Sequence, residues 1–404
     1  MKLLYLYNFN PSLPGVNIKI INKIRCLNNL GIDITILCFT SQTVHSELSD
    51  FKVIYASVLG KVQLPKLFNL KYLNFITQIV NDYRANKYYK EQLSKIDFDL
   101  LVMRYNSSNY HFNNLVKVFK NKIVFEHNTI ELEQFKLIYK GIINSNSWVS
   151  YTYFSEKYFA PKTLSNSAGI IGVTNEITNY EKRRVLHKNR LPLSITISNG
   201  INISEYPLHL PNRINSEINL VMILGVNAEW HGLERIIDGL NHYAGDKKIT
   251  LYVIGIVKQI PCSRVVYLGY MNSSEMNHFF ESHNIHFGIA SLSLHKINIK
   301  EASVLKAREY MARGIPFIYG YIDTDLESEP YLKDFFYQVD AIDEGIDINK
   351  MIEFYNNMSL VTDYPQKIRD FAFNKVDMSV KMKCYKDFLE DIMRIKIRLN
   401  SSNV

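Results

Sequence analysis

The first half of the chain alternates short apolar runs with amphipathic stretches. KLLYLYN and IDITILCF have strand length, and between them VNIKIINKIRCLNNLG repeats apolar residues at helical spacing and ends at a glycine. A strand, a helix and a second strand in this order predict a βαβ unit with parallel strands. The same pattern predicts further strands, the later ones with helices, in FKVIYAS, FDLLVMRYN, KIVFEHN, AGIIGVTNEITNYEKRRV and LSITISNGIN.

A second series of the same kind follows the segment 203–217, ISEYPLHLPNRINSE, which has two prolines and no periodicity and is therefore a candidate linker. Its strands and helices are predicted in INLVMILGVN, LERIIDGLNHYA, KITLYVIGI, VVYLGY, SSEMNHFFESH and IHFGIASLS. We therefore expect an α/β protein of two doubly wound, Rossmann-like domains, over 1–202 and 218–375, facing each other across a cleft. Ligands of such sheets bind beyond the carboxyl ends of the strands, so site residues should directly follow strands.

Composition agrees with two globular domains. The chain has 404 residues, of which 47% are hydrophobic and 21% charged, and no apolar run reaches the roughly 18 residues of a membrane span. The opening MKLLYLYNF is too short for a signal peptide and is followed by no small-residue cleavage site, so it is expected to be a strand. The four cysteines show no paired spacing, which favours neither zinc nor disulfides and suggests a reducing, cytoplasmic setting.

Charge is divided unevenly along the chain. Residues 1–200 contain 25 Lys and Arg against 13 Asp and Glu, whereas residues 201–404 contain 22 against 26. Such a split suggests that the first half meets an anionic partner, although an AT-rich genome that favours lysine codons is an alternative. In KVQLPKLFNLKYLNF and NDYRANKYYK the cations alternate with aromatic and aliphatic residues, which is typical of a surface that lies on an anionic membrane. No nucleic-acid recognition motif accompanies the basic half, so no nucleic-acid partner is expected.

The segment 298–320, NIKEASVLKAREYMARGIPFIYG, holds two glutamates around a short predicted helix. Ser303 is a candidate N-cap and Gly314 a candidate residue after the C-terminus, which places the helix at about 304–313. Glu301 then precedes the cap, and Glu309 lies about two turns into the helix. By spacing alone, Glu301 could simply interact with the helix dipole and Glu309 could be solvated.

This segment resembles the signature of the retaining GT-B glycosyltransferases of family four, also called glycosyl transferases group 1. In that family a glutamate, seven residues and a second glutamate precede a small-residue turn and a strand with proline. Three further stretches resemble the family's hinge and donor-domain elements in the same order: ITISNGINISEYP, LGVNAEWHGLERIIDGL and VVYLGYMNSSEMNHFF. VDMSVKMKCYKDFLEDIM, within 376–404, resembles the last helix of this fold, which returns to pack on the first domain.

The resemblance implies a role for each glutamate. Glu309 would accept hydrogen bonds from the ribose hydroxyls of a sugar nucleotide, and Glu301 would hold hydroxyls of the transferred sugar beside its anomeric carbon. The backbone amides of the loop from Ala302 to Leu305, which includes Ser303, would face the diphosphate. His127, in EHNT, resembles a histidine that the family places near sugar and acceptor, although a lone histidine is more often structural.

The chain also departs from the family pattern. The family's arginine and lysine for the leaving diphosphate are replaced by Val226 and by His231, and Asn227 follows in the same loop. Lys306 and Arg308 are the nearest substitutes for the missing charge. Where the family commonly has two glycines near the N-terminus, this chain has Gly15 followed by Val16. Gly15 would let backbone approach a phosphate, or it is an ordinary turn glycine.

The resemblance therefore implies a glycosyltransferase without cofactor or metal. It would move a sugar from a nucleotide-diphosphate donor to an acceptor hydroxyl with retention. The basic first half adds the expectation of a peripheral membrane enzyme with a lipid-linked or glycan acceptor, on the inner face of the bacterial cytoplasmic membrane, in surface-polysaccharide synthesis. The triplet DTD at 323–325 invites a metal interpretation, but its acidic loop has no matching histidine spacing and we expect no ion there. Two alternatives remain open: a GT-B nucleotide-sugar epimerase, and a non-catalytic partner subunit that kept the fold.

Overall fold

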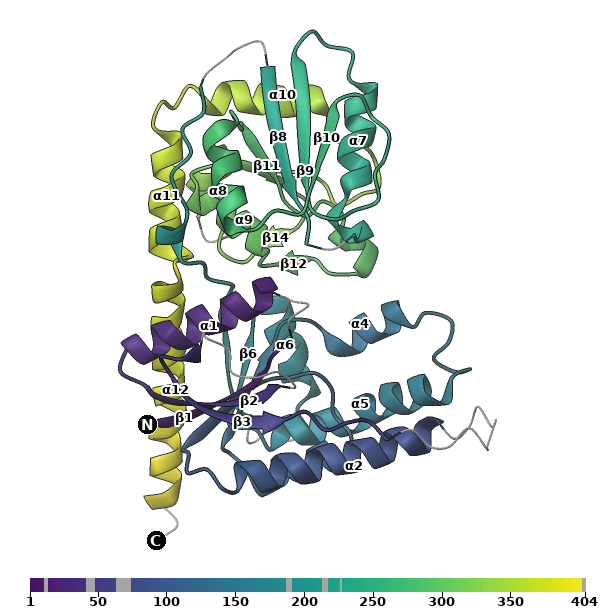
Figure 1. Cartoon of the computed structure of the whole chain (residues 1–404), viewed down its shortest axis with the longest axis vertical. Coiled ribbons are helices and arrows are strands. Elements are labelled where there is room, and N and C mark those ends of the chain that lie inside the picture. Colours follow the sequence, from purple (N-terminus) through teal and green to yellow (C-terminus); the bar gives the residue numbers. More distant parts are fainter. Residues whose placement is uncertain are drawn as a thin grey trace. The chain divides into compact units, whose positions relative to one another are not determined.

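The chain folds into two compact α/β units (Figure 1). The computed structural model describes residues 1–10, 14–40, 48–62, 74–186, 191–212, 217–225, 227–327 and 329–401. Unit 1 comprises Met1–Ile197 and Met382–Val404, and unit 2 comprises Ser198–Lys381. Among the described helices, none combines the length and the hydropathy that crossing a membrane requires.

Unit 1 is built on a seven-stranded parallel sheet. Its strand order is β3-β2-β1-β4-β5-β6-β7. The strands are β1 (Lys2–Asn8), β2 (Asp33–Thr40), β3 (Lys52–Ser57), β4 (Leu100–Arg104), β5 (Ile123–His127), β6 (Gly169–Gly172) and β7 (Leu193–Thr196). The central strands are buried along nearly their whole length, as expected for a parallel sheet with helices on both faces. Their continuous apolar runs are what made these strands predictable.

The helices of unit 1 cover the sheet and extend beyond one side of it. They are α1 (Pro14–Asn29), α2 (Asn74–Leu93), α3 (Tyr110–Val118), α4 (Glu131–Ile138), α5 (Ser147–Ser165) and α6 (Asn175–Arg184). Helices α2 and α5 lie side by side, with α4 near the first half of α5 (Figure 1). Hydrogen bonds from Trp148 Nε1 to Gln78 Oε1 (3.0 Å) and from Tyr151 OH to Asp82 Oδ2 (3.2 Å) join α5 to α2.

The C-terminal helix α12 (Met378–Ser401) supplies the last element of unit 1 from Met382 onward. Tyr385 OH donates to Glu126 Oε1 at 2.6 Å, and Lys23 of α1 pairs with the same carboxylate. A Cβ on Gly169 would lie 2.7 Å from Ile392 Cδ1, so glycine at this position of β6 lets α12 pack against the sheet. The far end of the chain is thus tied to the central strands of unit 1.

Unit 2 has a six-stranded parallel sheet of order β10-β9-β8-β11-β13-β15 and a separate pair, β12-β14. The six strands are β8 (Glu217–Ile223), β9 (Lys248–Ile254), β10 (Val265–Gly269), β11 (Phe287–Ile289), β13 (Phe317–Tyr319) and β15 (Phe336–Gln338). The pair consists of β12 (Glu301–Ala302) and β14 (Ile322–Asp323). Both domains predicted from the two strand series are therefore present as Rossmann-like, parallel α/β units.

Helices cover both faces of this second sheet. They are α7 (Leu233–His242), α8 (Ser273–Ser282), α9 (Leu305–Ala312), α10 (Ile348–Met358) and α11 (Tyr364–Lys375). Four 3-10 turns are also present: η4 (Ile203–Glu205), η5 (Glu229–His231), η6 (Leu294–Ile297) and η7 (Pro330–Asp334). Helix α8 begins with a full capping box between Asn272 and Glu275. The 3.6-residue periodicity of α7 and α8 had predicted both helices.

The described part of the expected linker, 203–212, packs on unit 2. Ile203 is fully buried, and both ring nitrogens of His209 lie near backbone carbonyls, Phe280 O at 3.0 Å and Ile285 O at 2.9 Å. The backbone N–H of His209 also donates to Arg313 O at 2.8 Å. The chain passes into unit 2 already at Ser198, before the segment that lacks periodicity.

Each sheet has one point at which the direction of strand addition reverses. In unit 1 it lies between β1 and β4, and in unit 2 between β8 and β11. Loops that leave two neighbouring strands there diverge to opposite faces of the sheet, which opens a crevice for ligands. The search for a functional site therefore begins at these two positions.

Candidate functional site

The loops that follow β8 and β11 are joined at the reversal point of unit 2. The N–H of Leu292 donates to His231 O at 3.1 Å, and the N–H of Ser293 donates to Trp230 O at 3.2 Å. Gly232 has φ +73°, and a Cβ there would lie 2.7 Å from both Leu292 Cβ and Ser293 Oγ. Glycine is required at 232 by its backbone conformation and by this close approach.

His231 and Lys306 meet in this crevice. Lys306 Nζ lies 3.1 Å from His231 Nδ1, and Ser291 Oγ lies 3.4 Å from the same nitrogen. Burial and the nearby Lys306 charge lower the pKa of His231 to about 3, so the imidazole is neutral. Because an ammonium can only donate, Nδ1 accepts and the proton of His231 lies on Nε2. Nε2 is buried and has no hydrogen-bond partner among the described residues.

Helix α9 points its N-terminus toward the same region. It begins at Leu305, its N-cap residue is Val304, and no side chain caps it. The prediction that Ser303 is the N-cap was wrong, because the Ser303 hydroxyl is engaged elsewhere. The uncapped first turn leaves backbone N–H groups without an intrahelical partner, which is the arrangement that favours an anion. The predicted end of the helix was correct: Gly314 follows it with φ +71°.

Arg308 is the centre of a buried ion network. Its guanidinium donates to both oxygens of Asp323, at 2.5 and 2.9 Å, to Asp325 Oδ2 at 2.6 Å and to Ser303 Oγ at 3.0 Å. Arg308 is completely buried. The expectation that Arg308 contacts the donor is therefore corrected: its charge is used inside the unit. The DTD triplet, whose metal interpretation was rejected, holds this arginine with both of its aspartates.

The network extends to the residues that connect the units. Ser198 Oγ donates to Asp325 Oδ1 at 2.8 Å, and Lys381 Nζ donates to the same oxygen at 2.5 Å. The N–H of Asn199 donates to Ser303 Oγ at 2.8 Å. The loop before α9 is thus held by β14 and the residues after it, and by the two segments where the chain enters and leaves unit 2.

Glu301 lies on β12, four residues before α9 begins. Its strand pairs in parallel with β14 through Glu301 and Ile322, and Glu301 is 9% exposed. Ala302 is half-buried beside it. The β12-β14 pair, which the sequence did not predict, is what holds this carboxylate at the carboxyl edge of the sheet.

A cavity of about 620 Å³ lies beyond the ends of β13 and β15. Its lining includes His295, Asn298, Lys300, Tyr321, Gln338 and Asp340. Lys300, which precedes Glu301, lines this cavity, whereas Glu301 does not.

Glu309 follows Lys306 by three residues and lies on the same side of α9. Its carboxylate pairs with Arg313, one turn further along the helix. Burial raises the pKa of Glu309, and the Arg313 charge opposes that rise. Structure thus brings His231, Lys306 and Glu309 to one side of α9. Asn227 is exposed in the loop after β8, and Val226 lies outside the described residues.

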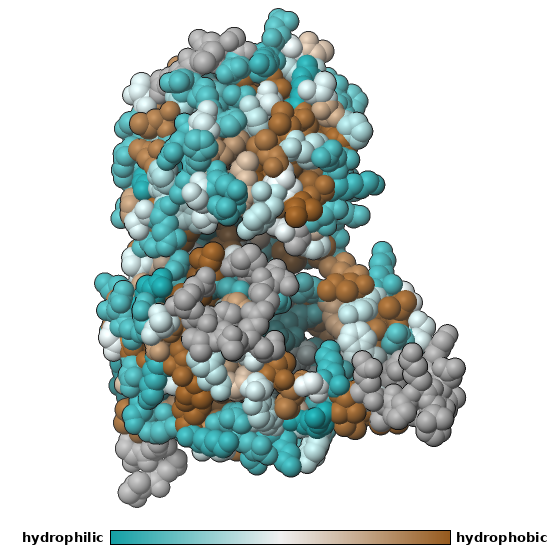
Figure 2. Space-filling view, in the orientation of Figure 1, coloured by the Kyte–Doolittle hydropathy of each residue, from teal (hydrophilic) through white to brown (hydrophobic). Residues whose placement is uncertain are grey.

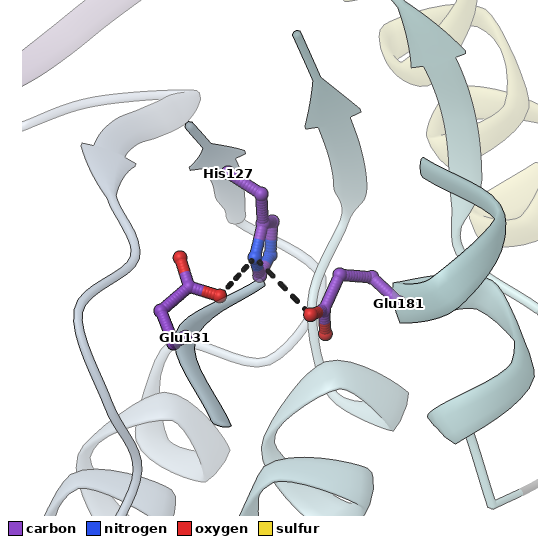
Figure 3. Close-up of side chains that lie close together, drawn as sticks. All are labelled: His127, Glu131 and Glu181. Atoms are coloured by element: carbon purple, nitrogen blue, oxygen red, sulfur yellow. Dashed lines mark hydrogen bonds and ion pairs between the residues drawn. The ribbon is translucent and has the colours of Figure 1, made fainter. Parts of the chain in front are cut away.

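In unit 1, His127 ends β5 and is completely buried (Figure 3). Its Nδ1 lies 3.4 Å from Glu131 Oε2 and 3.8 Å from Glu181 Oε1, and its ring stacks on Tyr105 at 4.6 Å between centroids. Burial lowers the pKa of His127. The expectation that His127 touches sugar and acceptor is corrected, because a residue without exposed surface cannot make that contact. The sequence correctly placed His127 at the end of a strand, but the packing around it decides whether a ligand can reach the side chain.

The carboxylates around His127 are themselves buried. Burial raises the pKa of Glu181 to about 7, and Arg184 pairs with Glu181 at 3.1 Å and with Glu156 at 2.5 Å. His127, Glu131 and Glu181 each offer one possible metal-ligand atom, and these atoms lie within 4.8 Å of one another. The guanidinium of Arg184 already supplies a cation to this group. That no metal takes part in the reaction stays a prediction.

The reversal point of unit 1 carries cations that the sequence interpretation did not single out. Lys19 Nζ lies 3.4 Å from Asn128 Oδ1, directly after β5, and Arg104 ends β4 and is exposed. Burial, followed by the charges of Lys23 and Arg104, lowers the pKa of Lys19 to about 8. The sequence signal that could have identified them is the position of a cation at the end of a predicted strand, as for Arg104, or near the start of the first helix, as for Lys19.

Gly15 and Val16 lie in the first turn of α1, at the carboxyl end of β1. Gly15 is exposed, its φ is not positive, and a Cβ there would meet nothing within 4 Å. Neither strain nor packing therefore requires a glycine at this position. A role of Gly15 in letting a ligand approach the backbone stays a prediction.

Comparison with known structures shows which fold this is. A glycosyltransferase from Rickettsia africae matches with TM-score 0.64 over 97% of this chain and 98% of its own, at 13% identity. WaaG, a glycosyltransferase involved in lipopolysaccharide biosynthesis, matches with TM-score 0.59 over 95% and 98% of the two chains, at 13% identity. The chain has the GT-B fold.

A third match adds a bound ligand. HepE from Anabaena, in complex with UDP and glucose, matches this GT-B chain with TM-score 0.57 over 97% of it and all of HepE, at 11% identity. No protein-family model matches the sequence, and no curated protein matches it significantly. The similarity therefore lies in the three-dimensional structure.

Substitution of Lys306 tests the charge in the crevice. Burial lowers the pKa of Lys306 to about 7 from 10.5. The unfolded chain then binds the proton more tightly, so this group destabilises the fold below pH 7, and the penalty fades as pH rises from about 7 to 10.5. Lys306→Met should raise the melting temperature at pH 6.5 by about 2–4 °C and by less at pH 9.5.

The matched control is Lys333→Met, at an exposed lysine of the same unit. It should change the melting temperature little at either pH, because this exposed ammonium stays in contact with water in the folded and the unfolded chain. A Lys306→Met protein that melts lower than wild type at pH 6.5 would contradict the assignment of a costly buried charge.

Proposed function

We propose that this protein is a retaining glycosyltransferase that takes its sugar from a nucleotide-diphosphate donor. The observation that carries the proposal is the cluster of hydrogen-bond donors at the reversal point of unit 2. There an ammonium, an imidazole N–H without a partner and the uncapped N-terminus of α9 gather within one loop cluster. All three are donors or positive charges, and a diphosphate is a ligand with the complementary chemistry.

The positive charge that the family pattern places at position 231 is supplied here by another residue. Lys306 supplies the cation that position 231 would otherwise carry, and His231 offers its Nε2–H as a neutral donor. Since Lys306 has a pKa of about 7 without ligand, a bound diphosphate raises that pKa and binding takes up a proton. HepE, which shares this fold, has been crystallised with UDP and glucose, which supports a sugar nucleotide as the ligand here.

In the proposed reaction, the bond between the anomeric carbon and the diphosphate oxygen breaks, and a bond to the acceptor oxygen forms on the same face. The acceptor proton passes to the departing phosphate oxygen. Glu301 accepts hydrogen bonds from sugar hydroxyls and holds the ring, while Lys306, His231 and the α9 amides stabilise the negative charge that grows on the leaving group. No covalent intermediate on a second carboxylate is required.

The acceptor is proposed to be a lipid-linked glycan, as in bacterial capsule, O-antigen or exopolysaccharide synthesis. Lys19 and Arg104 lie at the reversal point of unit 1, and their charges would suit a phosphate of a lipid-linked saccharide. WaaG is a lipopolysaccharide enzyme and shares this fold, which supports the same kind of pathway. The protein would work in the cytoplasm, on the inner face of the membrane.

A hydrophobic surface on unit 1 supports that location. Figure 2 shows brown, hydrophobic side chains gathered over the region of α4. Ile138 at the end of α4 is 64% exposed and Ile142 in the following loop is 42% exposed. Lys140 lies exposed between them, and Lys157 and Phe154 are exposed on α5. Apolar side chains beside lysines are typical of a surface that enters an anionic lipid interface. Most of the stretch KVQLPKLFNLKYLNF, on which the membrane prediction first rested, lies outside the described residues.

The function is tested by incubating the protein with a panel of sugar nucleotides, with and without a lipid-linked acceptor. A glycosyltransferase forms a glycosylated acceptor of retained anomeric configuration. An epimerase consumes or converts the donor without acceptor, and a non-catalytic subunit does neither. Either of the last two results would overturn the proposal.

Glu301→Gln tests the carboxylate. The amide keeps the shape but loses the charge that accepts two hydroxyl donors, so kcat should fall by about 10²–10³ while the affinity for the nucleotide diphosphate changes little. Glu327→Gln, at an exposed carboxylate beyond β14, is the matched control and should keep wild-type kcat. Activity of Glu301→Gln within a few-fold of wild type would remove Glu301 from the site.

Vesicle binding tests the membrane surface. Wild type should sediment with anionic vesicles more than with neutral ones, and the double variant Ile138→Asp, Ile142→Asp should lose most of that binding because it places charge in the lipid interface. Leu360→Asp changes a still more exposed apolar residue in unit 2 and should bind as wild type. Equal, weak binding of wild type to both vesicle types would count against a membrane partner.

A further inference from the structure

We propose that Arg313 is a positioning residue, which holds the Glu309 carboxylate so that one of its oxygens is presented to the ribose of the donor nucleotide. This inference rests on the proposed function, in which Glu309 reads the ribose hydroxyls. It adds a residue to donor recognition that the family pattern does not contain, because the resemblance places a small residue at this turn and the chain reads ARGIP.

The geometry of the pair is asymmetric. Arg313 donates from Nε at 3.0 Å and from Nη2 at 2.9 Å, and both bonds go to the same oxygen, Glu309 Oε1. Within the part of the chain that the structure describes, every hydrogen bond of the Glu309 carboxylate is to Arg313 and through this oxygen. The side chain of Glu309 is 16% exposed. Oε2 therefore remains as the acceptor for an incoming hydroxyl.

Arg313 is itself held firmly. Its side chain is 1% exposed, and the guanidinium carbon lies 4.2 Å from the ring centroid of Phe280 on α8 and 5.0 Å from that of Tyr206. Nη2 also donates to Asn277 Oδ1 at 2.7 Å. A guanidinium that packs against two rings and donates to two side chains loses little further freedom when its partner binds a ligand.

The charge of Arg313 has a second consequence for Glu309. A carboxyl group in this half-buried position resists ionisation because burial raises its pKa, and the adjacent guanidinium counteracts that effect. In the ionised form, Oε2 carries no proton and is free to accept from a hydroxyl donor. Arg313 therefore sets the orientation of the Glu309 carboxylate and favours its ionised form.

Isothermal titration of the full chain with matched nucleotides tests the inference. The probes are the nucleoside diphosphate that binds wild type best, from UDP, GDP and ADP, and its 2′,3′-dideoxy form. Wild type should bind the ribose form at least about tenfold more tightly. Arg313→Gln should reduce this ratio to less than about threefold while its affinity for the dideoxy form stays near wild type. Arg313→Lys, with a single ammonium, should show an intermediate ratio.

A double-variant cycle separates positioning from general damage. Glu309→Gln should lower the ratio as Arg313→Gln does, and combining the two should lower it no further, because both act on one contact. Arg264→Gln is the matched control: Arg264 donates to the carbonyls of Leu240 and Tyr243 and packs on the Tyr243 ring. It should lower the melting temperature without changing the ratio.

Should Arg313→Gln fail to fold, Asn277→Ala removes only the second bond of Arg313 and should lower the ratio partly. An unchanged ratio in the folded variants, or equal weakening of both nucleotides, would overturn the inference and leave the proposed function standing. Absence of nucleotide binding by wild type would overturn both.

Discussion

The ion network around Arg308 is the constraint on which the candidate site depends. A guanidinium without exposed surface is neutralised by Asp323 and Asp325 and bonded to Ser303, so α9, β14 and the loop that bears Glu301 are fixed to one another. Removing one member of such a buried pair leaves an unpaired charge and costs about 3–5 kcal/mol. The network also receives Ser198 and Lys381, where the chain enters and leaves unit 2. The position of the loop before α9 and the path of the chain are thus set by the same buried charges.

Around this fixed frame, the cations of the crevice are arranged differently from the family pattern. One lysine on α9 reaches the imidazole that occupies the expected lysine position, and burial together with the lysine charge keeps that imidazole neutral. The two groups act as one unit, since the lysine determines which nitrogen of His231 carries the proton. Such a buried ammonium destabilises the protein without ligand. Strongly shifted pKa values of this kind are common at functional sites. Glu309 and its partner Arg313 lie further along the same side of α9.

Much of the fold followed from the sequence because its signals are local. Buried parallel strands read as apolar runs, and the glycine after α9 needs a positive φ that few other residues adopt. The short pair β12-β14 gave no such signal, since two residues make no period, and it is stabilised by contacts distant in sequence. Ser303 and Arg308 were assigned to the donor because they lie close to the signature, but sequence distance does not show that an arginine finds two aspartates 15 and 17 residues later.

The sequence also did not show which side chains at the strand ends are accessible to a ligand. His127 follows a strand at the functional edge of its sheet, as a catalytic histidine would, but helices α4 and α6 bring Glu131 and Glu181 over it. Lys19 and Arg104 escaped notice in a half rich in cations, because their importance comes from the strand order that places β1 beside β4. Position relative to strand ends was predictable, whereas which side chains remain open to a ligand depends on packing.

Hydrogen–deuterium exchange with and without a bound sugar nucleotide tests the central claim most directly, because it reports where the donor binds without relying on any substitution. The account predicts that slowed exchange on binding is concentrated in unit 2 at three stretches: the loop 227–232, the loop 290–293, and β12 with the first turn of α9, 301–308. Protection confined to other parts of the chain, with these three stretches unchanged, would contradict a donor site at the reversal point between β8 and β11.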